Sequence, residues 1–487
     1  MKDILKLFSL KFVSAILGLV SSIITVRLFG ASRTIEVYFA AQSLVYLVTS
    51  LTQSGQLAEI FLPEYHKLNS KAEGLGFEGL NVVINRFFIW GIVIIGLVFL
   101  ISPVLIKLMV PGFDELEQEE SVLIFRVLLP YLLLQLFNSF FITVLNAEKK
   151  YGRAEFLGIS NVVVNIIVLL VLYKYLGVWA IVISVLFGKM IEFVFYLSQL
   201  YKIGFRYKFT FSILDFDHST FFKTMQSTFL YVGSTQIYMV VLTAGISFLP
   251  EGTYAIFKYV QGLSNKIKGL VVQPFMTIFF TTYSSLLHRL KSVKEEFNKY
   301  FKSIICINVV TIIGTVLLGD IFIDILWGGK KFTSEDVQLA YVFLVFYGFS
   351  ILFSSIGGVY RKMSVAHGFG KQLYQLWVVS QLISALLSYT FLKYFQVKGL
   401  FLIIPVNTLL MSLVSIIVYY KTKKPIKYSL LNLNNLFFLI LIVISYIIKS
   451  NLDLILDNRF ASLSIFLVTT VVLSIYPIIN IYKIFRK

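Results

Sequence analysis

Apolar segments long enough to cross a bilayer recur along the whole chain, and they constrain the fold more than any other feature. Examples are WGIVIIGLVFLISPVLIKLMV, NVVVNIIVLLVLYKYLGVW and FLVTTVVLSIYPIINIY. A hydrocarbon core about 30 Å thick is spanned by a helix of about 20 apolar residues. Short alternating segments, which are typical of membrane β-barrels, are absent. The sequence therefore predicts an all-α, multi-pass integral membrane protein.

Composition agrees with this fold class. Hydrophobic residues make up 58% of the 487 residues, charged residues 14%, and the mean hydropathy is +0.84. A soluble domain has roughly a quarter charged residues. We expect fourteen transmembrane helices, at about 6–28, 34–60, 84–110, 121–146, 154–174, 178–201, 222–249, 253–285, 301–327, 335–361, 370–393, 398–420, 432–449 and 460–482.

Basic residues are distributed unequally between the two sides that these spans define. Of the 43 Lys and Arg residues, 28 lie at the termini and the connections on one side, and 10 lie on the other side, which also carries the acidic loop PGFDELEQEES. Cytoplasmic loops carry an excess of Lys and Arg, so both termini are expected in the cytoplasm. The same bias accounts for most of the net charge of +18, and no nucleic-acid partner is needed.

The spans suggest two lobes of six helices and a C-terminal pair. We expect an N-lobe at 1–201, a cytoplasmic linker at 202–221, a C-lobe at 222–427 and an appendage of two helices at 428–487. Each lobe opens with a long helix, a tight outer turn (LFGASRT or FLPEGT) and a second long helix with polar residues. Repeats of this kind are common in transporters.

Enzymatic chemistry has no evident location in this sequence. Cys306 is the only cysteine, and the four histidines are far apart, so no metal site or other cofactor is expected. Walker, HExxH and GxSxG motifs do not occur. The outer loops are too small for a membrane glycan polymerase. The sequence is therefore interpreted as a transporter and not an enzyme.

Three lysines stand in the predicted eighth span, within KYVQGLSNKIKG. If Lys258 is set to 0° and each residue advances about 100°, Lys266 falls near +80° and Lys268 near −80°. Gln261, Asn265 and Gln273 fall in the same half of the helix. Because a charge inside a membrane is costly, these lysines are expected to face water and receive an anion; pairing with acids and snorkelling are the alternatives.

Polar residues of other spans can complete such a cavity. Ser21, Ser22 and Gln42 are the candidates in the first two spans. Carboxylates are possible partners of the lysines, or possible proton-coupling groups: Glu36 and Glu192 are the main candidates, and Glu59, Asp320 and Asp324 are further acids. Lys189 and Glu192 are three residues apart and can neutralise each other.

Three segments resemble the MurJ/MviN lipid II flippases of the multidrug, oligosaccharidyl-lipid and polysaccharide exporter superfamily. The first is RLFGASRTIEVYFAAQSLVYLVTSLTQSGQLAEIFLPEYHKL, the second is ISFLPEGTYAIFKYVQGL, and the third is FTSEDVQLAYVFLVFYGFS. The resemblance implies a V-shaped, two-lobed fold of the kind shared with multidrug (MATE) exporters, alternating access, and a cationic central cavity for a lipid diphosphate saccharide. It also implies a bacterial inner-membrane location, with membrane lipids around the chain, and we expect a monomer.

The sequence departs from this family at the expected ligands. Family members typically have an Arg-Asp pair on the first helix, where this chain has Ser21 and Ser22, and an arginine on the eighth helix at the position of Gly262. Lys258, Lys266 and Lys268 would then have to bind the diphosphate.

The function expected from these features is a flippase for an undecaprenyl-diphosphate-linked saccharide, either lipid II or an O-antigen or exopolysaccharide repeat unit, in the synthesis of peptidoglycan or another envelope glycan. A MATE-type small-molecule or drug exporter is the alternative. A non-transporting scaffold and a membrane glycan polymerase are further, weaker alternatives.

Overall fold

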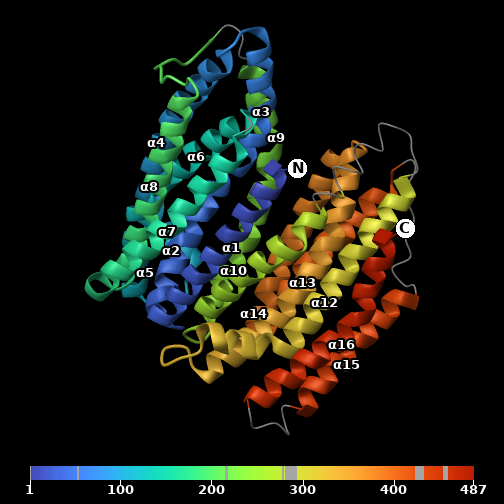
Figure 1. Ribbon diagram of the computed structural model, residues 1–487. Coiled ribbons are helices and arrows are strands. Elements are labelled where there is room, and N and C mark those ends of the chain that lie inside the picture. The colour runs from blue at the N-terminus through green and yellow to red at the C-terminus, as the bar shows by residue number, and fades with distance from the viewer. Residues whose placement is uncertain are drawn as a thin grey trace. The chain divides into compact units, whose positions relative to one another are not determined.

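The computed structural model is entirely helical apart from short connections and one isolated bridge (Figure 1). It describes the chain except for residues 1, 52–53, 149, 214–217, 277–278, 280–292, 423–432, 453–458 and 487. The chain forms two compact units, Met1–Glu251 and Gly252–Lys487.

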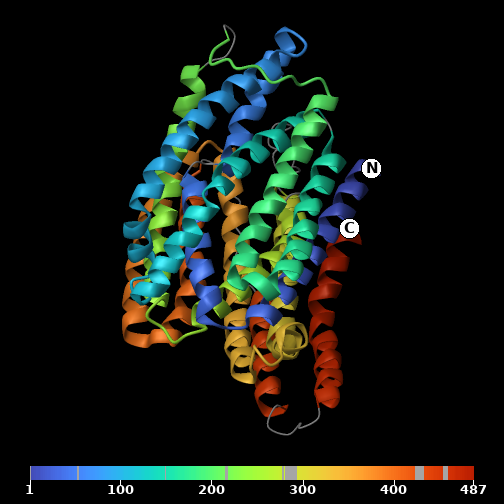
Figure 2. The same cartoon turned by 90° about the vertical axis from the view of Figure 1, so that its left-hand side faces the viewer.

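The first unit has nine described helices, which lie alongside one another in both views (Figures 1 and 2). They are α1 (Lys2–Phe29), α2 (Arg33–Leu51), α3 (Ser54–Lys71), α4 (Leu75–Met109), α5 (Glu115–Leu128), α6 (Pro130–Ala147), α7 (Tyr151–Leu176), α8 (Val178–Lys202) and α9 (His218–Ile246). Its core includes the aromatic residues Phe61, Tyr65, Phe140 and Tyr196, all of them at most 1% exposed. Helix α9, the predicted seventh span, packs against α2, α3 and α4.

The second unit has six described helices: α10 (Thr253–Val271), α12 (Val293–Trp327), α13 (Ser334–Ala366), α14 (Gly370–Tyr420), α15 (Leu433–Leu452) and α16 (Arg459–Arg486). Helix α14 is two helices joined at Gln396, whose φ of 49° interrupts the helical backbone. This is the connection that the sequence places between its eleventh and twelfth spans. Helices α15 and α16 both pack on α12.

The predicted spans coincide with helices wherever the structure describes them, and residues 277–278 and 280–285 of the eighth span lie outside the described residues. By length and apolarity alone, nine stretches of the described residues can cross a membrane, and one of them is the kinked Gly370–Tyr420. The all-helical membrane fold is therefore confirmed. The division into 1–201, 202–221, 222–427 and 428–487 stays a prediction. Part of the predicted linker lies along the start of α4, where Asn85 Nδ2 donates to the carbonyl oxygens of Lys208 and Thr210, each at 2.9 Å.

The C-terminal helix pair is attached to α12 by a buried ion pair. Lys449 Nζ lies 2.7 Å from Asp320 Oδ2 and 4.2 Å from the ring centroid of Phe466. Lys449 is only 4% exposed and lies within α15, so it belongs to the helix packing. Asp320, a possible partner of the α10 lysines by sequence, has Lys449 as its described ion-pair partner.

Helix α9 is tied to the turn between α4 and α5 at Gly112. The backbone N–H of Gly112 donates to Ser247 Oγ at 2.9 Å, and a Cβ at this position would lie 2.7 Å from the Phe248 nitrogen. A side chain is therefore excluded by backbone atoms, which cannot move aside as a flexible side chain would.

We predict that Gly112→Ala destabilises the protein by more than 1 kcal/mol, because the methyl group forces the two turns apart. Gly96→Ala, on α4, is the matched control, since nothing lies within 4 Å of its Cβ position. Alanine should favour that helix by about 0.5–1 kcal/mol. Thermal unfolding in detergent measures both variants; equal melting temperatures for Gly112→Ala and the parent would refute the close approach.

Candidate functional site

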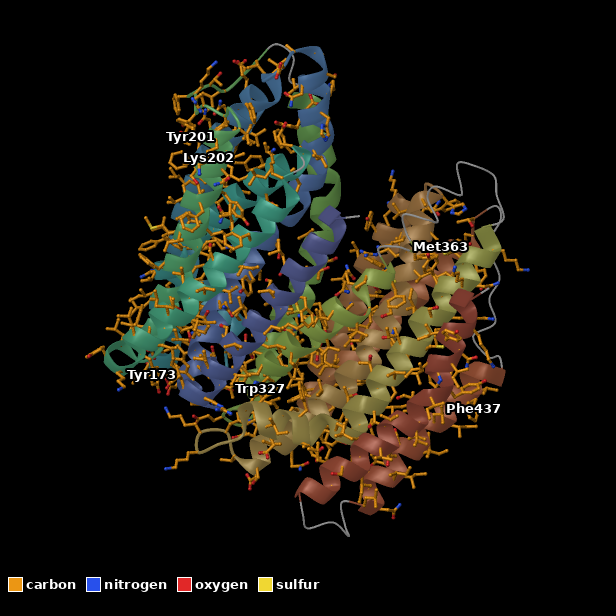
Figure 3. All side chains as sticks on the ribbon, viewed as in Figure 1. Tyr173, Tyr201, Lys202, Trp327, Met363 and Phe437 are labelled. Atoms are coloured by element: carbon orange, nitrogen blue, oxygen red, sulfur yellow. The ribbon has the colours of Figure 1, made fainter. Side chains whose placement is uncertain are left out.

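Helix α10 buries one side in the core of the second unit. Gly252, with φ 86°, starts the helix from a left-handed turn that favours glycine. Phe257 lies 6.1 Å from Phe343 between ring centroids, and Tyr259 lies 6.0 Å from Trp327, which is labelled in Figure 3. These aromatic contacts fix the rotation of α10 about its own axis.

The opposite side of α10 carries the polar residues that the helical spacing grouped together. Asn265 is exposed, and Lys258, Lys266 and Lys268 are partly exposed. Nothing lies within 4 Å of a Cβ built at Gly262 or at Gly269. This side, which we call the lysine face (Lys258, Gln261, Gly262, Asn265, Lys266, Lys268 and Gly269), therefore leaves room for a ligand to approach the helix backbone.

Two lysines of this face, Lys258 and Lys268, are held by weak or neutral contacts. Lys258 Nζ lies 5.5 Å from the ring centroid of Tyr254, one turn earlier. Lys268 Nζ donates to Ser354 Oγ on α13 at 2.9 Å. In the described part of the chain neither lysine forms an ion pair with a carboxylate. Their positive charges are therefore available to an anion.

The other candidate polar residues are found as follows. Gln261 on α10 is partly exposed, and Gln273, which follows α10, is exposed. In the first unit, Ser21 and Ser22 are partly exposed on α1, and Gln42 Nε2 donates to the hydroxyl of Tyr38 at 2.6 Å. Within the described residues no group of three or more His, Cys, Asp or Glu could hold a metal ion.

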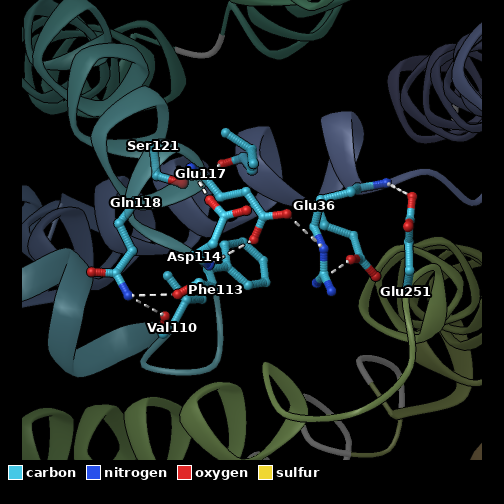
Figure 4. A network of polar contacts seen from close by, with 10 residues as sticks. Glu36, Val110, Phe113, Asp114, Glu117, Gln118, Ser121 and Glu251 are labelled. Carbon is cyan, nitrogen blue, oxygen red and sulfur yellow. Dashed lines mark hydrogen bonds and ion pairs between the residues drawn. The ribbon is translucent and has the colours of Figure 1, made fainter.

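Glu36 is fully buried and belongs to a network around Arg33 (Figure 4). Arg33 Nη1 lies 2.8 Å from Glu36 Oε2, and Arg33 Nε lies 3.2 Å from Glu117 Oε1 at the start of α5. The backbone N–H of Arg33 donates to Glu251 Oε1 at 2.8 Å, and its guanidinium lies 4.7 Å from the ring centroid of Phe113. The start of α2, the start of α5 and the turn after α9 are thereby joined through one arginine.

Comparison with known proteins identifies the family. The sequence matches the family "Lipid II flippase MurJ" over residues 25–473, which is most of the chain. The chain belongs to the MurJ lipid II flippase family. The predicted resemblance is confirmed, and so is the interpretation as a transporter and not an enzyme.

Individual members and structures agree with the assignment to MurJ. A "Probable lipid II flippase MurJ" of Thermotoga maritima is 23% identical over 383 residues, which cover 77% of this chain and 75% of that relative. The solved structure "Lipid II flippase MurJ, inward closed conformation" has a TM-score of 0.79 at 19% identity, covering 99% of this chain and all of that one. An inward-facing MATE transporter of the MOP superfamily has a TM-score of 0.66 at 14% identity, covering 89% of this chain and 95% of that one.

A second buried ion pair occupies Glu192 in this MurJ family member. Lys189 Nζ lies 2.6 Å from Glu192 Oε2 on the same helix, and the two residues are 8% and 5% exposed. Asn161 Nδ2 on α7 donates to the same oxygen at 2.8 Å, and Lys189 Nζ lies 5.5 Å from the ring centroid of Tyr131. The i,i+3 spacing had predicted this neutralisation.

Sequence reasoning did not find the partners that come from distant segments. Ser354 for Lys268, and Glu117 and Glu251 for Arg33, depend on how helices pack, and no local spacing reveals them. The pair of Arg33 with Glu36 could have been found, because the i,i+3 spacing is visible in RTIE. The side chain of Glu59 lies outside the described residues.

We predict that Lys189→Met destabilises the protein by about 3–5 kcal/mol, because it leaves the Glu192 carboxylate buried with only an amide as partner. The double variant Lys189→Met/Glu192→Gln should recover most of the loss, since it removes both charges. Lys174→Met, at an exposed lysine of α7, serves as the control. Thermal unfolding in detergent measures the stability of the series. If Lys189→Met is as stable as the parent, the ion pair contributes nothing to stability.

Proposed function

We propose that this MurJ family member moves a polyprenyl-diphosphate-linked saccharide from the inner to the outer leaflet and that the lysine face of α10 binds the diphosphate. The observation that carries the proposal is the pair of lysines, Lys258 and Lys268, that lie on a partly exposed helix face with no carboxylate partner among the described residues. A charge in a spanning segment is costly, so an unneutralised group there indicates a functional site.

The chemistry of the face suits a diphosphate linked to a sugar. Ammonium groups form charge-assisted hydrogen bonds with phosphate oxygens, which are roughly twice as strong as neutral ones. Gly262 and Gly269 allow a bulky group to approach the helix backbone, because nothing lies within 4 Å of their Cβ positions. We propose that Gln261, Asn265 and Gln273 hydrogen-bond the saccharide, and Ser21, Ser22 and Gln42 stay predicted cavity residues.

We propose lipid II, the lipid-linked peptidoglycan precursor, as the substrate, since the family and the Thermotoga relative carry that name. Lysines replace the arginine that resembling sequences have at Gly262, so the cavity keeps its positive sign with different donors. Another undecaprenyl-diphosphate repeat unit offers the same phosphates and differs only in its sugars. Cationic drugs, which many MATE-type exporters move, would be repelled by this face.

The positions of charged residues also suggest roles for the two buried glutamates and an orientation for the chain. We propose that Glu36 and Glu192 act as charge partners of Arg33 and Lys189 and not as coupling groups, because each carboxylate already has a cation within 3 Å. We further propose a monomer in a bacterial inner membrane with both termini in the cytoplasm, on the basis of the distribution of Lys and Arg.

We predict that replacing Lys258, Lys266 and Lys268 by Gln, singly and together, slows translocation of labelled lipid II in proteoliposomes. Each lost charge-assisted bond is worth about 1.5–3 kcal/mol, so each single change should weaken binding about tenfold or more. The triple variant should be inactive.

Lys174→Gln is the matched control, since it removes an exposed charge elsewhere. A triple variant that translocates lipid II at the parental rate would contradict the proposed site. Parallel assays with an O-antigen-type carrier lipid and with a cationic drug identify the transported class.

A steric test uses glycine. Gly262→Leu should leave stability unchanged or raised, because its side chain meets open space, yet it should reduce lipid II binding at least tenfold by filling the approach to the backbone. Gly314→Leu on α12, which also has nothing within 4 Å, is the control and should leave binding unchanged. Equal binding by both variants, measured by fluorescence titration, would place the ligand elsewhere.

A further inference from the structure

Arg126 is a basic residue of a predicted span that the proposed function does not use. Lys189 is paired with Glu192, and Lys258, Lys266 and Lys268 lie on the lysine face. Arg126 stands near the end of α5 and is partly exposed. A guanidinium keeps its charge at every relevant pH, so its position requires a partner or water.

The described contacts of Arg126 hold it in place without neutralising it. Its Nε donates to Ser102 Oγ on α4 at 2.9 Å, and its guanidinium lies 4.5 Å from the ring centroid of Phe99. Ser102 is fully buried and itself donates to the Phe99 carbonyl at 2.8 Å. Among the described residues no carboxylate lies within ion-pair distance of Arg126, and the N–H groups of its two Nη atoms have no acceptor.

The surface around Arg126 is apolar and exposed. On α4, Phe99 and Leu100 are 44% and 73% exposed, and on α5, Val127 is 42% exposed. Phe99 and Leu100 precede Ser102 on α4, and Val127 follows Arg126 on α5, so all three lie farther from the acidic loop than the contact of Arg126 with Ser102. Exposed apolar side chains on a membrane-spanning helix pair are covered by lipid chains.

Arg126 lies close to the end of the α4–α5 helix pair that carries the acidic loop. The acidic residues of α5 end at Glu120, and six residues of helix from Glu120 to Arg126 correspond to about 9 Å. On antiparallel α4, the exposed Lys107 lies five residues beyond Ser102, or about 7.5 Å nearer the same end. Arg126 and Lys107 thus lie nearer the acidic loop than Leu100 and Val127 do, which is the order expected of phosphate-binding cations and chain-covered apolar residues.

We propose that Arg126, oriented by Ser102 and Phe99 and assisted by Lys107, binds the phosphate of an anionic phospholipid whose acyl chains cover Phe99, Leu100 and Val127. The unused N–H pairs of the guanidinium match two phosphate oxygens. The site is formed by α4 and α5 of the first unit and includes no residue of α10. It does not depend on the proposed transport activity.

The test is phosphatidylglycerol binding to the purified full-length protein after delipidation, measured by native mass spectrometry. Arg126→Gln should lower the affinity about tenfold or more, as expected for a lost charge-assisted pair. Lys174→Gln, which removes an exposed charge from α7, should leave it unchanged. Soluble glycerol phosphate should not compete, because it lacks the acyl chains.

Arg126→Lys keeps the positive charge. It tests whether Arg126 binds the lipid phosphate even if the glutamine variant does not fold. Its affinity should fall about threefold or more, since an ammonium cannot donate to Ser102 and to two phosphate oxygens with the same fork geometry. Parental affinity in a folded Arg126 variant would overturn the proposal. So would competition by glycerol phosphate alone, or displacement of phosphatidylglycerol by equimolar lipid II.

Discussion

The cost of placing a charge inside a membrane is the constraint on which this structure depends. Charged side chains in spanning helices persist where they are paired, hydrogen-bonded or open to water. Lys189 with Glu192 and Lys449 with Asp320 are paired at 2.6 and 2.7 Å. Each pair has little exposure, and each lies where helices pack: α8 against α7, and α15 against α12. These charges therefore contribute to the architecture of their units.

The lysines of α10 meet the same constraint through neutral contacts and partial exposure, without an ion pair for Lys258 or Lys268. Lys258 rests against an aromatic ring, Lys268 is bonded to a neutral hydroxyl, and the face around them is partly exposed. A charge that is neutralised by a partner cannot bind an anionic ligand, whereas these ammonium groups can. We propose that the difference between neutralised and available charges separates structural from functional lysines in this member of the MurJ family; it rests on geometry that composition alone does not contain.

Much of the fold could be predicted from the sequence, because apolar length and turn residues are local properties. The break at Gln396 and the polar face of α10 both follow from hydrophobic spacing. Partners across helices could not be predicted. The contacts of Lys268 with Ser354 and of Arg33 with Glu117 join segments 86 and 84 positions apart. The ion pair of Lys449 with Asp320 joins residues 129 positions apart. Family resemblance supplied the substrate class, and the structure supplied the side of α10 that a ligand can reach.

The central claim is that the ammonium groups of the lysine face contact the diphosphate. Solid-state NMR can measure it directly through ¹⁵N–³¹P dipolar dephasing, with ¹⁵Nζ-lysine protein in bilayers and bound lipid II. The account predicts dephasing that corresponds to N–P distances of about 3–4 Å, as charge-assisted N–H···O bonds require. The signal should disappear when Lys258, Lys266 and Lys268 are all replaced by Gln. Dephasing that persists unchanged in the triple variant, or is absent from the parent with lipid II bound, would contradict the account.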